Sequence, residues 1–253
     1  MCGRYVSSST PDEIARYFDA DEQPERPLEP SWNVAPTDDV YVVLERDDER
    51  VVAEHHWGLV PFWAKSPAIG TKMINARADG LATKSAFKDS FARKRCIVPA
   101  DGFYEWDQIP GQKVKQPYLI TRRSGEPLAF AGLWASWRPP GGEGDEHLRS
   151  TTIITTTAND LMQRVHDRMP VILPARAWDE WLDPTNHDVE ALGRLLVPAP
   201  ADLLTMRPVS TEVNNVRNQG AHLIDPVEAP PAAPAPPGEE PASPGDAGPK
   251  AVV

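Results

Sequence analysis

Cys2 follows the initiator methionine directly, in the opening stretch MCGRYV. Removal of Met1, which a small second residue permits, would leave Cys2 with a free α-amine and a thiol on adjacent carbons. Unperturbed, these groups titrate at about 7.7–8.0 and about 8.5, so both are partly nucleophilic near neutral pH. With an ester or amide, the thiol would attack and the amine would act as base. With an aldehyde, the amine would form a Schiff base on which the thiol closes a five-membered thiazolidine ring. The alternative is a frayed chain end without a chemical role.

We expect the secondary structure that positions Cys2 to consist mainly of strands. Thr10 as N-cap, Pro11 at the first helical position and two acidic residues after it predict a helix that starts at Pro11. Apolar runs predict strands over residues 40–45, 51–57, 96–100, 102–106, 116–120, 127–134 and 150–156, and short helices are expected over 85–95, 159–165, 175–182 and 189–196.

The order of these elements predicts the fold class. Strands outnumber helices and do not alternate regularly with them, which favours an α+β fold over a doubly wound one. We therefore expect a single domain, residues 1–225, with a curved, mostly antiparallel β-sheet or barrel-like core flanked by short helices. Residues 226–253 are rich in proline, alanine and glycine and cannot bury enough apolar surface to offset ordering entropy, so a disordered tail is predicted.

Composition excludes several classes of protein. The sequence has neither a run of eighteen apolar residues nor a signal-peptide pattern, so a cytoplasmic protein without a membrane partner is expected. Its two cysteines, Cys2 and Cys96, form neither a disulfide framework nor a zinc motif, and Cys96 is expected to be a buried small residue. His55 and His56 are adjacent on a predicted strand and point to opposite faces, so no metal and no cofactor are predicted.

The charge distribution is strongly uneven. The chain has a net charge of −11, which argues against general nucleic-acid binding, yet residues 57–125 hold 12 basic against 5 acidic residues. From composition alone, this basic segment is either a solvated face or an anion-binding surface.

Six stretches together resemble the signature of one family. They are MCGRY, SWNVAPT (31–37), WGLVPFWAK (57–65), MINARADG (73–80), CIVPADGFYEW (96–106) and VHDRMPVIL (165–173). In this order they resemble the SRAP-domain family of abasic-site processing proteins, and the resemblance extends from Cys2 to about Gly220. It implies recognition of abasic sites in single-stranded DNA, with a covalent link through the N-terminal cysteine to the aldehyde of the ring-opened deoxyribose.

The resemblance also implies three residues that assist Cys2. Glu105 would accept a proton from the Cys2 ammonium, and its apolar neighbours predict desolvation and a raised carboxyl pKa. His166 would assist opening of the sugar ring, because its imidazole titrates near physiological pH. Asn75 would orient the sugar or the cysteine by hydrogen bonds. The alternatives are a surface carboxylate, a core histidine and a turn-forming asparagine respectively.

The basic middle of the chain and its neighbours supply three arginines that are expected to contact DNA. Arg4, Arg77 and Arg168 each lie within three residues of a proposed reactive residue and would contact flanking phosphates. Their alternative is a surface ion pair. Around Lys84 and Lys88 family members often have arginines, so individual phosphate contacts there are open.

Two aromatic residues and one asparagine complete the predicted DNA-binding set. Phe62 and Trp63 follow a proline turn and would wedge against the bases next to the lesion, unless they are buried in the core. Asn33 is expected to shape the pocket near Cys2. Trp178 and Trp181, three apart on a predicted helix, indicate packing.

Three functions remain compatible with the sequence. The favoured one is a monomeric protein that shields abasic sites in single-stranded DNA through a thiazolidine crosslink. The second is a Cys2-dependent thiol hydrolase or peptidase, including removal of its own Met1, although no oxyanion hole is identifiable. The third is a non-covalent single-strand binder.

Overall fold

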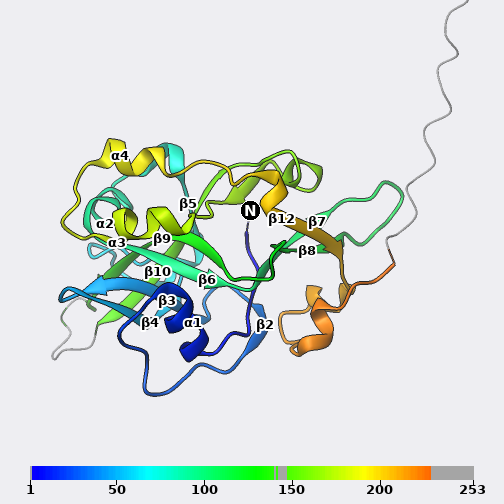
Figure 1. Cartoon of the computed structure of the whole chain (residues 1–253), viewed down its shortest axis with the longest axis horizontal. Helices are drawn as coiled ribbons and strands as arrows, with labels where there is room; N and C mark the ends of the chain where they lie inside the picture. The colour runs from blue at the N-terminus through cyan, green and yellow to red at the C-terminus, as the bar shows by residue number, and fades with distance from the viewer. Residues whose placement is uncertain (1, 140, 142–146, 229–253) are drawn as a thin grey trace, which may run out of the picture.

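The computed structural model describes residues 2–139, 141 and 147–228 (Figure 1). Most of the predicted tail, residues 229–253, lies outside the described residues. Among the residues that are described, no helix is both long and apolar enough to cross a bilayer.

Five strands close into a barrel at the centre of the domain. Around it run β10 (Leu148–Thr157), β4 (Glu49–Trp57), β3 (Asp39–Arg46), β6 (Arg95–Ala100) and β9 (Leu128–Trp137), which pairs back with β10. Only the β10–β4 pairing in this ring is parallel. The predicted α+β fold with a mostly antiparallel, barrel-like core is therefore confirmed.

The two faces of the barrel strands pack into different clusters, as strand alternation requires. Val42, Cys96 and Phe130 belong to the cluster that also contains Cys2 and Tyr5. The neighbouring residues Val43, Ile97 and Ala131 pack against the helices on the other side, among Phe18 and the tryptophans Trp178 and Trp181. The predictions that Cys96 is buried and that both tryptophans pack in the core are confirmed.

A second sheet packs beside the barrel and contains the chain start. Its order is β12 (Leu204–Pro208), β8 (Gln116–Arg122), β7 (Gly102–Asp107), β1 (Tyr5–Ser7) and β2 (Ser31–Val34). Because β1 pairs antiparallel with both β7 and β2, the residues just before it are held from two sides.

Two three-residue strands extend the barrel at β10. β5 (Asn75–Arg77) runs parallel to β10, and β11 (Arg168–Pro170) runs antiparallel to it. Neither strand was predicted from the sequence. They bring Asn75 and Arg168, which are far apart in the chain, to the C-terminal half of β10.

The helices are short. α1 (Pro11–Phe18) begins where predicted, with a capping box in which the Thr10 hydroxyl accepts from the Glu13 N–H and the Glu13 carboxylate accepts from the Thr10 N–H. The others are α2 (Lys88–Arg93), α3 (Trp178–Leu182) and α4 (Val189–Arg194), with 3₁₀ turns η1 (Pro67–Lys72), η2 (Ala78–Gly80), η3 (Met162–Arg164), η4 (Ala175–Ala177), η5 (Ala201–Leu203), η6 (Thr211–Asn214) and η7 (Ala221–Ile224).

The helix predicted over residues 159–165 is wrong. Only the turn η3 forms there: the Asn159 side chain accepts from the N–H of Met162 at its start, and it ends early because the chain then leaves to pair as β11. The helix predicted over 85–95 is shorter than expected, since Arg95 already belongs to β6.

Candidate active site

Cys2 is fully buried just before β1. The Nδ2 group of Asn75 donates a hydrogen bond of 2.8 Å to its carbonyl oxygen, which joins the chain start to β5. The Oδ1 atom of Asn75 is also buried, and no group among the described residues donates to it. It therefore offers an acceptor next to Cys2 for an incoming hydroxyl or amine.

Glu105 lies on β7, the strand next to β1, and is 3% exposed. Burial raises the pKa of its carboxyl above the ordinary value, as the apolar neighbours predicted. A surface position is thereby excluded. Because burial raises this pKa, Glu105 can exchange a proton nearer to neutral pH than an exposed glutamate can, although the nearby Lys115 acts in the opposite direction by stabilising the carboxylate.

The Cys2 thiol is protonated at neutral pH in this environment. Burial raises the pKa of the thiol well above its usual range, and the negative charge of Glu105 raises it further. Reactive thiolates need the opposite surroundings, namely exposure and positive charge. A neighbouring base must therefore take the thiol proton, or the thiol must act after another group has reacted.

His166 lies between η3 and β11, with partial exposure. Burial lowers the pKa of its imidazole, so the ring is neutral near pH 7. Its Nδ1 atom accepts from the Arg168 N–H at 2.9 Å and also lies 2.8 Å from Oδ1 of Asp167. These contacts suit different protonation states: a deprotonated Nδ1 accepts from Arg168, and a protonated Nδ1 donates to Asp167. Nδ1 can therefore gain or lose a proton and have one hydrogen-bond partner in either state.

Two of the predicted arginines border this group of residues. In the register of β10, Arg77 of β5 lies beside Thr155, and the Arg168 Nη2 group donates to the Thr155 carbonyl at 2.6 Å. Arg77 is exposed, and within the described part of the chain no ion pair or hydrogen bond to its guanidinium occurs. Contact of either arginine with a DNA phosphate remains a prediction.

Arg4 and Asn33, predicted to contact DNA phosphates and to shape the pocket near Cys2, make hydrogen bonds within the protein. The Arg4 Nη1 group donates to Oδ1 of Asn33 at 2.7 Å and to the carbonyl of Val213 at 2.9 Å, and its guanidinium lies over the Trp106 ring. Asn33 is fully buried, and its Nδ2 group contacts the carbonyls of Val213, Asn215 and Asn218. Together they fasten residues 210–220, here called the C-terminal strap, onto the second sheet. Contact of Arg4 or Asn33 with DNA remains a prediction, and it would require these bonds to open.

Phe62 and Trp63 lie apart from Cys2, beyond the end of β4. They are 67% and 45% exposed, so burial in the core is excluded for both. The Trp63 Nε1 group donates to the carbonyl of Ser85 at 3.4 Å, which links their loop to the segment before α2.

Sequence reasoning missed three residues of the site. Lys115 affects the pKa values of both Glu105 and His166, and Asp167 contacts His166 directly. Tyr5 is fully buried, and its hydroxyl has no hydrogen-bond partner among the described residues. Lys115 could have been found from its place in a lysine-rich turn after GFYEW, and Asp167 from its position next to His166. Within the described ranges, no group of three or more histidine, cysteine, aspartate or glutamate side chains could hold a metal ion.

Comparison with known proteins gives consistent matches over nearly the whole described chain. A family profile described as "SOS response associated peptidase (SRAP)" matches residues 1–216. Abasic site processing protein YoqW of Bacillus subtilis (strain 168) is 42% identical over 226 residues, covering 89% of this chain and 99% of that protein. Abasic site processing protein YedK of Escherichia coli (strain K12) is 34% identical over 236 residues, covering 90% and 100%. A solved structure from Bacteroides thetaiotaomicron has a TM-score of 0.79 at 24% identity, covering 90% of this chain and 100% of that one, and supports the fold alone.

Proposed function

Since the chain belongs to the SRAP family, we propose that it processes abasic sites in single-stranded DNA by capturing them covalently on Cys2 after Met1 has been removed. The observation that carries this proposal is the grouping of three side chains at the chain start: the Asn75 amide bonds to the Cys2 carbonyl, the buried Glu105 carboxylate acts on the Cys2 thiol, and the His166 imidazole shares the electrostatic neighbours Lys115 and Asp167 with Glu105. The relatives named above are abasic site processing proteins, which supports the same substrate class.

The proposed chemistry starts at the amine. The Cys2 nitrogen attacks C1′ of the open-chain deoxyribose and forms a C–N bond, and the carbonyl oxygen leaves as water after taking up two protons. The Cys2 sulfur then attacks the resulting imine carbon and forms a C–S bond, while the thiol proton passes to the nitrogen. The balanced outcome is a thiazolidine and one water molecule, with no oxidant or reductant.

The surroundings of Cys2 support this order of steps. The raised pKa of the thiol disfavours a thiolate that attacks first. Once the amine has reacted and the imine nitrogen is protonated, the imine carbon is a stronger electrophile than the aldehyde, and the adjacent thiol can attack it within the same residue. Glu105 would take a proton from the Cys2 ammonium, and His166 would shuttle protons during opening of the sugar ring. Asn75 would hold Cys2 through its carbonyl and present Oδ1 to the sugar. The same raised pKa argues against a thiol peptidase.

A denaturing gel tests the proposal. Protein whose intact mass shows loss of Met1 is incubated with a single-stranded oligonucleotide containing one abasic site, without borohydride. We expect a slowly migrating band that survives denaturation and is absent with Cys2→Ala. Cys96→Ala, which removes a second buried thiol, is the matched control and should retain the band.

Two other results would overturn covalent capture. Cleavage of a peptide without DNA capture would favour the thiol hydrolase. A shift seen only on a native gel and lost with salt would favour a non-covalent binder.

A further inference from the structure

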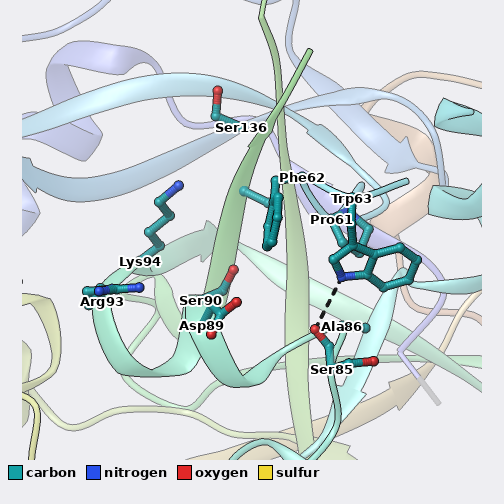
Figure 2. A pocket seen from close by; sticks show the side chains of 11 residues that line it. Pro61, Phe62, Trp63, Ser85, Ala86, Asp89, Ser90, Arg93, Lys94 and Ser136 are labelled. Atoms are coloured by element: carbon teal, nitrogen blue, oxygen red, sulfur yellow. Dashed lines mark hydrogen bonds between the residues drawn. The ribbon is translucent and has the colours of Figure 1, made fainter. Parts of the chain in front are cut away.

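A cavity of about 300 Å³ lies next to Phe62, away from Cys2. It is bounded by the loop after β4, by the segment from Ser85 through α2, and by the end of β9 (Figure 2). Its volume is at the lower end of the range of ligand pockets, which suits one ring system rather than an extended ligand.

The walls of this cavity include an unusually accessible aromatic surface. Figure 2 shows Phe62 projecting above Asp89 and Ser90, with Trp63 held beside it through its bond to Ser85. An exposed phenyl ring at the edge of a cavity provides a face for stacking, and every nucleobase has a complementary face. Ala86 and Ala135 add an apolar lining.

The charged side chains of the cavity do not pair with one another among the described residues. Asp89 and Arg93 are four residues apart on α2, yet the described residues include no ion pair between them. Lys94 lies next to them, with its ammonium 5.1 Å from the ring centre of Trp134. The cavity therefore combines one carboxylate acceptor with two cations and a stacking surface, the groups that a base and its phosphate require.

We propose that this cavity holds the base of one intact nucleotide of the strand whose abasic site reacts at Cys2. The proposal rests on the proposed function and deepens it by adding a choice of sequence context. The Phe62 ring stacks on the base, and the Asp89 carboxylate accepts from its exocyclic amine, which favours cytosine or adenine over thymine. Arg93 and Lys94 attract the phosphate of the same nucleotide.

The fold sets the distance between the cavity and the reactive residue. Ser136 of the cavity is opposite Arg149 in β10, and Asn75 is opposite Ile153 in the same strand. These positions are four residues apart along β10, or about 13 Å at 3.3 Å per residue, and β9 and β5 flank opposite edges of β10, which adds about 10 Å across the sheet. Stacked nucleotides are about 3.4 Å apart and extended ones farther, so the bound base is within about five nucleotides of the lesion.

A scan of missing bases tests this inference without the covalent step. Single strands have a tetrahydrofuran residue, which lacks an aldehyde, at the lesion and a second one at each neighbouring position in turn. Affinities are measured by fluorescence anisotropy. We expect one position at which loss of the base weakens binding about 5- to 100-fold in the unaltered protein. With Phe62→Ala, loss of that base should have no effect.

Two further variants sharpen the result. Val197→Ala removes an apolar side chain of similar exposure, 56%, outside the cavity, and should retain the dependence on that base. Asp89→Ala should abolish the preference for cytosine or adenine over thymine at the same position. Phe62→Ala is expected to remain folded, because the ring is largely exposed, and thermal unfolding checks this.

The outcomes separate the inference from the function on which it rests. If the unaltered protein crosslinks reactive abasic DNA but shows no Phe62-dependent position, the cavity does not bind a base and the inference is wrong. If no crosslink forms, the covalent function fails instead. A Phe62-dependent position would then still support a nucleotide pocket, without lesion chemistry.

Discussion

Replacing His55 should make the protein less sensitive to mild acid. His55 lies on β4 at 2% exposure, with its ring 5.5 Å from that of Trp134. Its Nδ1 atom is buried without a hydrogen-bond partner among the described residues. Burial lowers the pKa of the imidazole to about 3, and the positive charge of Arg149 acts in the same direction. The folded protein therefore resists protonation of this ring far below the usual pKa.

The size of the effect follows from the difference between the folded and unfolded states. An unfolded histidine titrates near 6.5, so below that pH the unfolded chain binds a proton that the folded chain does not. The stability associated with neutral His55 is complete above pH 6.5 and is lost as pH falls toward 3. At pH 5 the loss is about 2 kcal/mol, since each pH unit below 6.5 costs about 1.36 kcal/mol.

Urea unfolding at pH 7.5 and at pH 5 measures this loss for each protein separately. The unaltered chain should lose stability between the two pH values, and His55→Gln should lose about 2 kcal/mol less. His56→Gln is the matched control: it changes the adjacent histidine, whose side chain is 25% exposed and faces Asp39, and should behave like the unaltered chain. His166 contributes equally to all three proteins. An equal acid-induced loss in His55→Gln and the unaltered chain would refute the reasoning.

Two further predictions concern the reactive group and the C-terminal strap. Because burial raises the pKa of Glu105, the single-turnover capture rate should rise with pH, with a midpoint above the ordinary glutamate pKa of about 4.3. The Glu105→Gln variant should react more slowly, and its rate should not show this rise. An unchanged pH profile in that variant would exclude Glu105 as the proton acceptor. Asn33→Ala removes an Nδ2 group that contacts three carbonyls and an Oδ1 atom that accepts from Arg4, and should lower the free energy of unfolding by about 2–3 kcal/mol, measured in urea, and accelerate tryptic cleavage after Arg217. Cleavage there at the unaltered rate would show that Asn33 does not hold the strap.

The sequence was enough to predict those helices and strands whose formation depends on residues close together in the chain. The helix at Pro11 was predictable because its cap, its proline and its acidic first turn lie within four residues. The barrel strands were predictable because their apolar residues form continuous or alternating runs. In contrast, β5 and β11 have three residues each and no apolar pattern of their own, and they exist because β10 provides the pairing partner.

The candidate site was predictable in its chemistry but not in all its contacts. Cys2, Asn75, Glu105 and His166 were identified through their motifs; in the structure Asn75 bonds to Cys2, Glu105 acts on the Cys2 thiol, and His166 shares charged neighbours with Glu105. Their catalytic roles remain predictions. The contacts of Asn33 depend on carbonyls 180 or more positions further along the chain, which no local pattern reveals.

β10 has pairing partners on both of its edges along much of its length: β9 and β4 around its first half, β5 and β11 around its second. A slip of one residue would break all four ladders and turn each side chain to the opposite face. The pairing of β10 therefore fixes the separation between the reactive cysteine and the Phe62 cavity. Any selectivity for bases near a lesion should then be tied to a fixed number of nucleotides and should not drift as the DNA flexes.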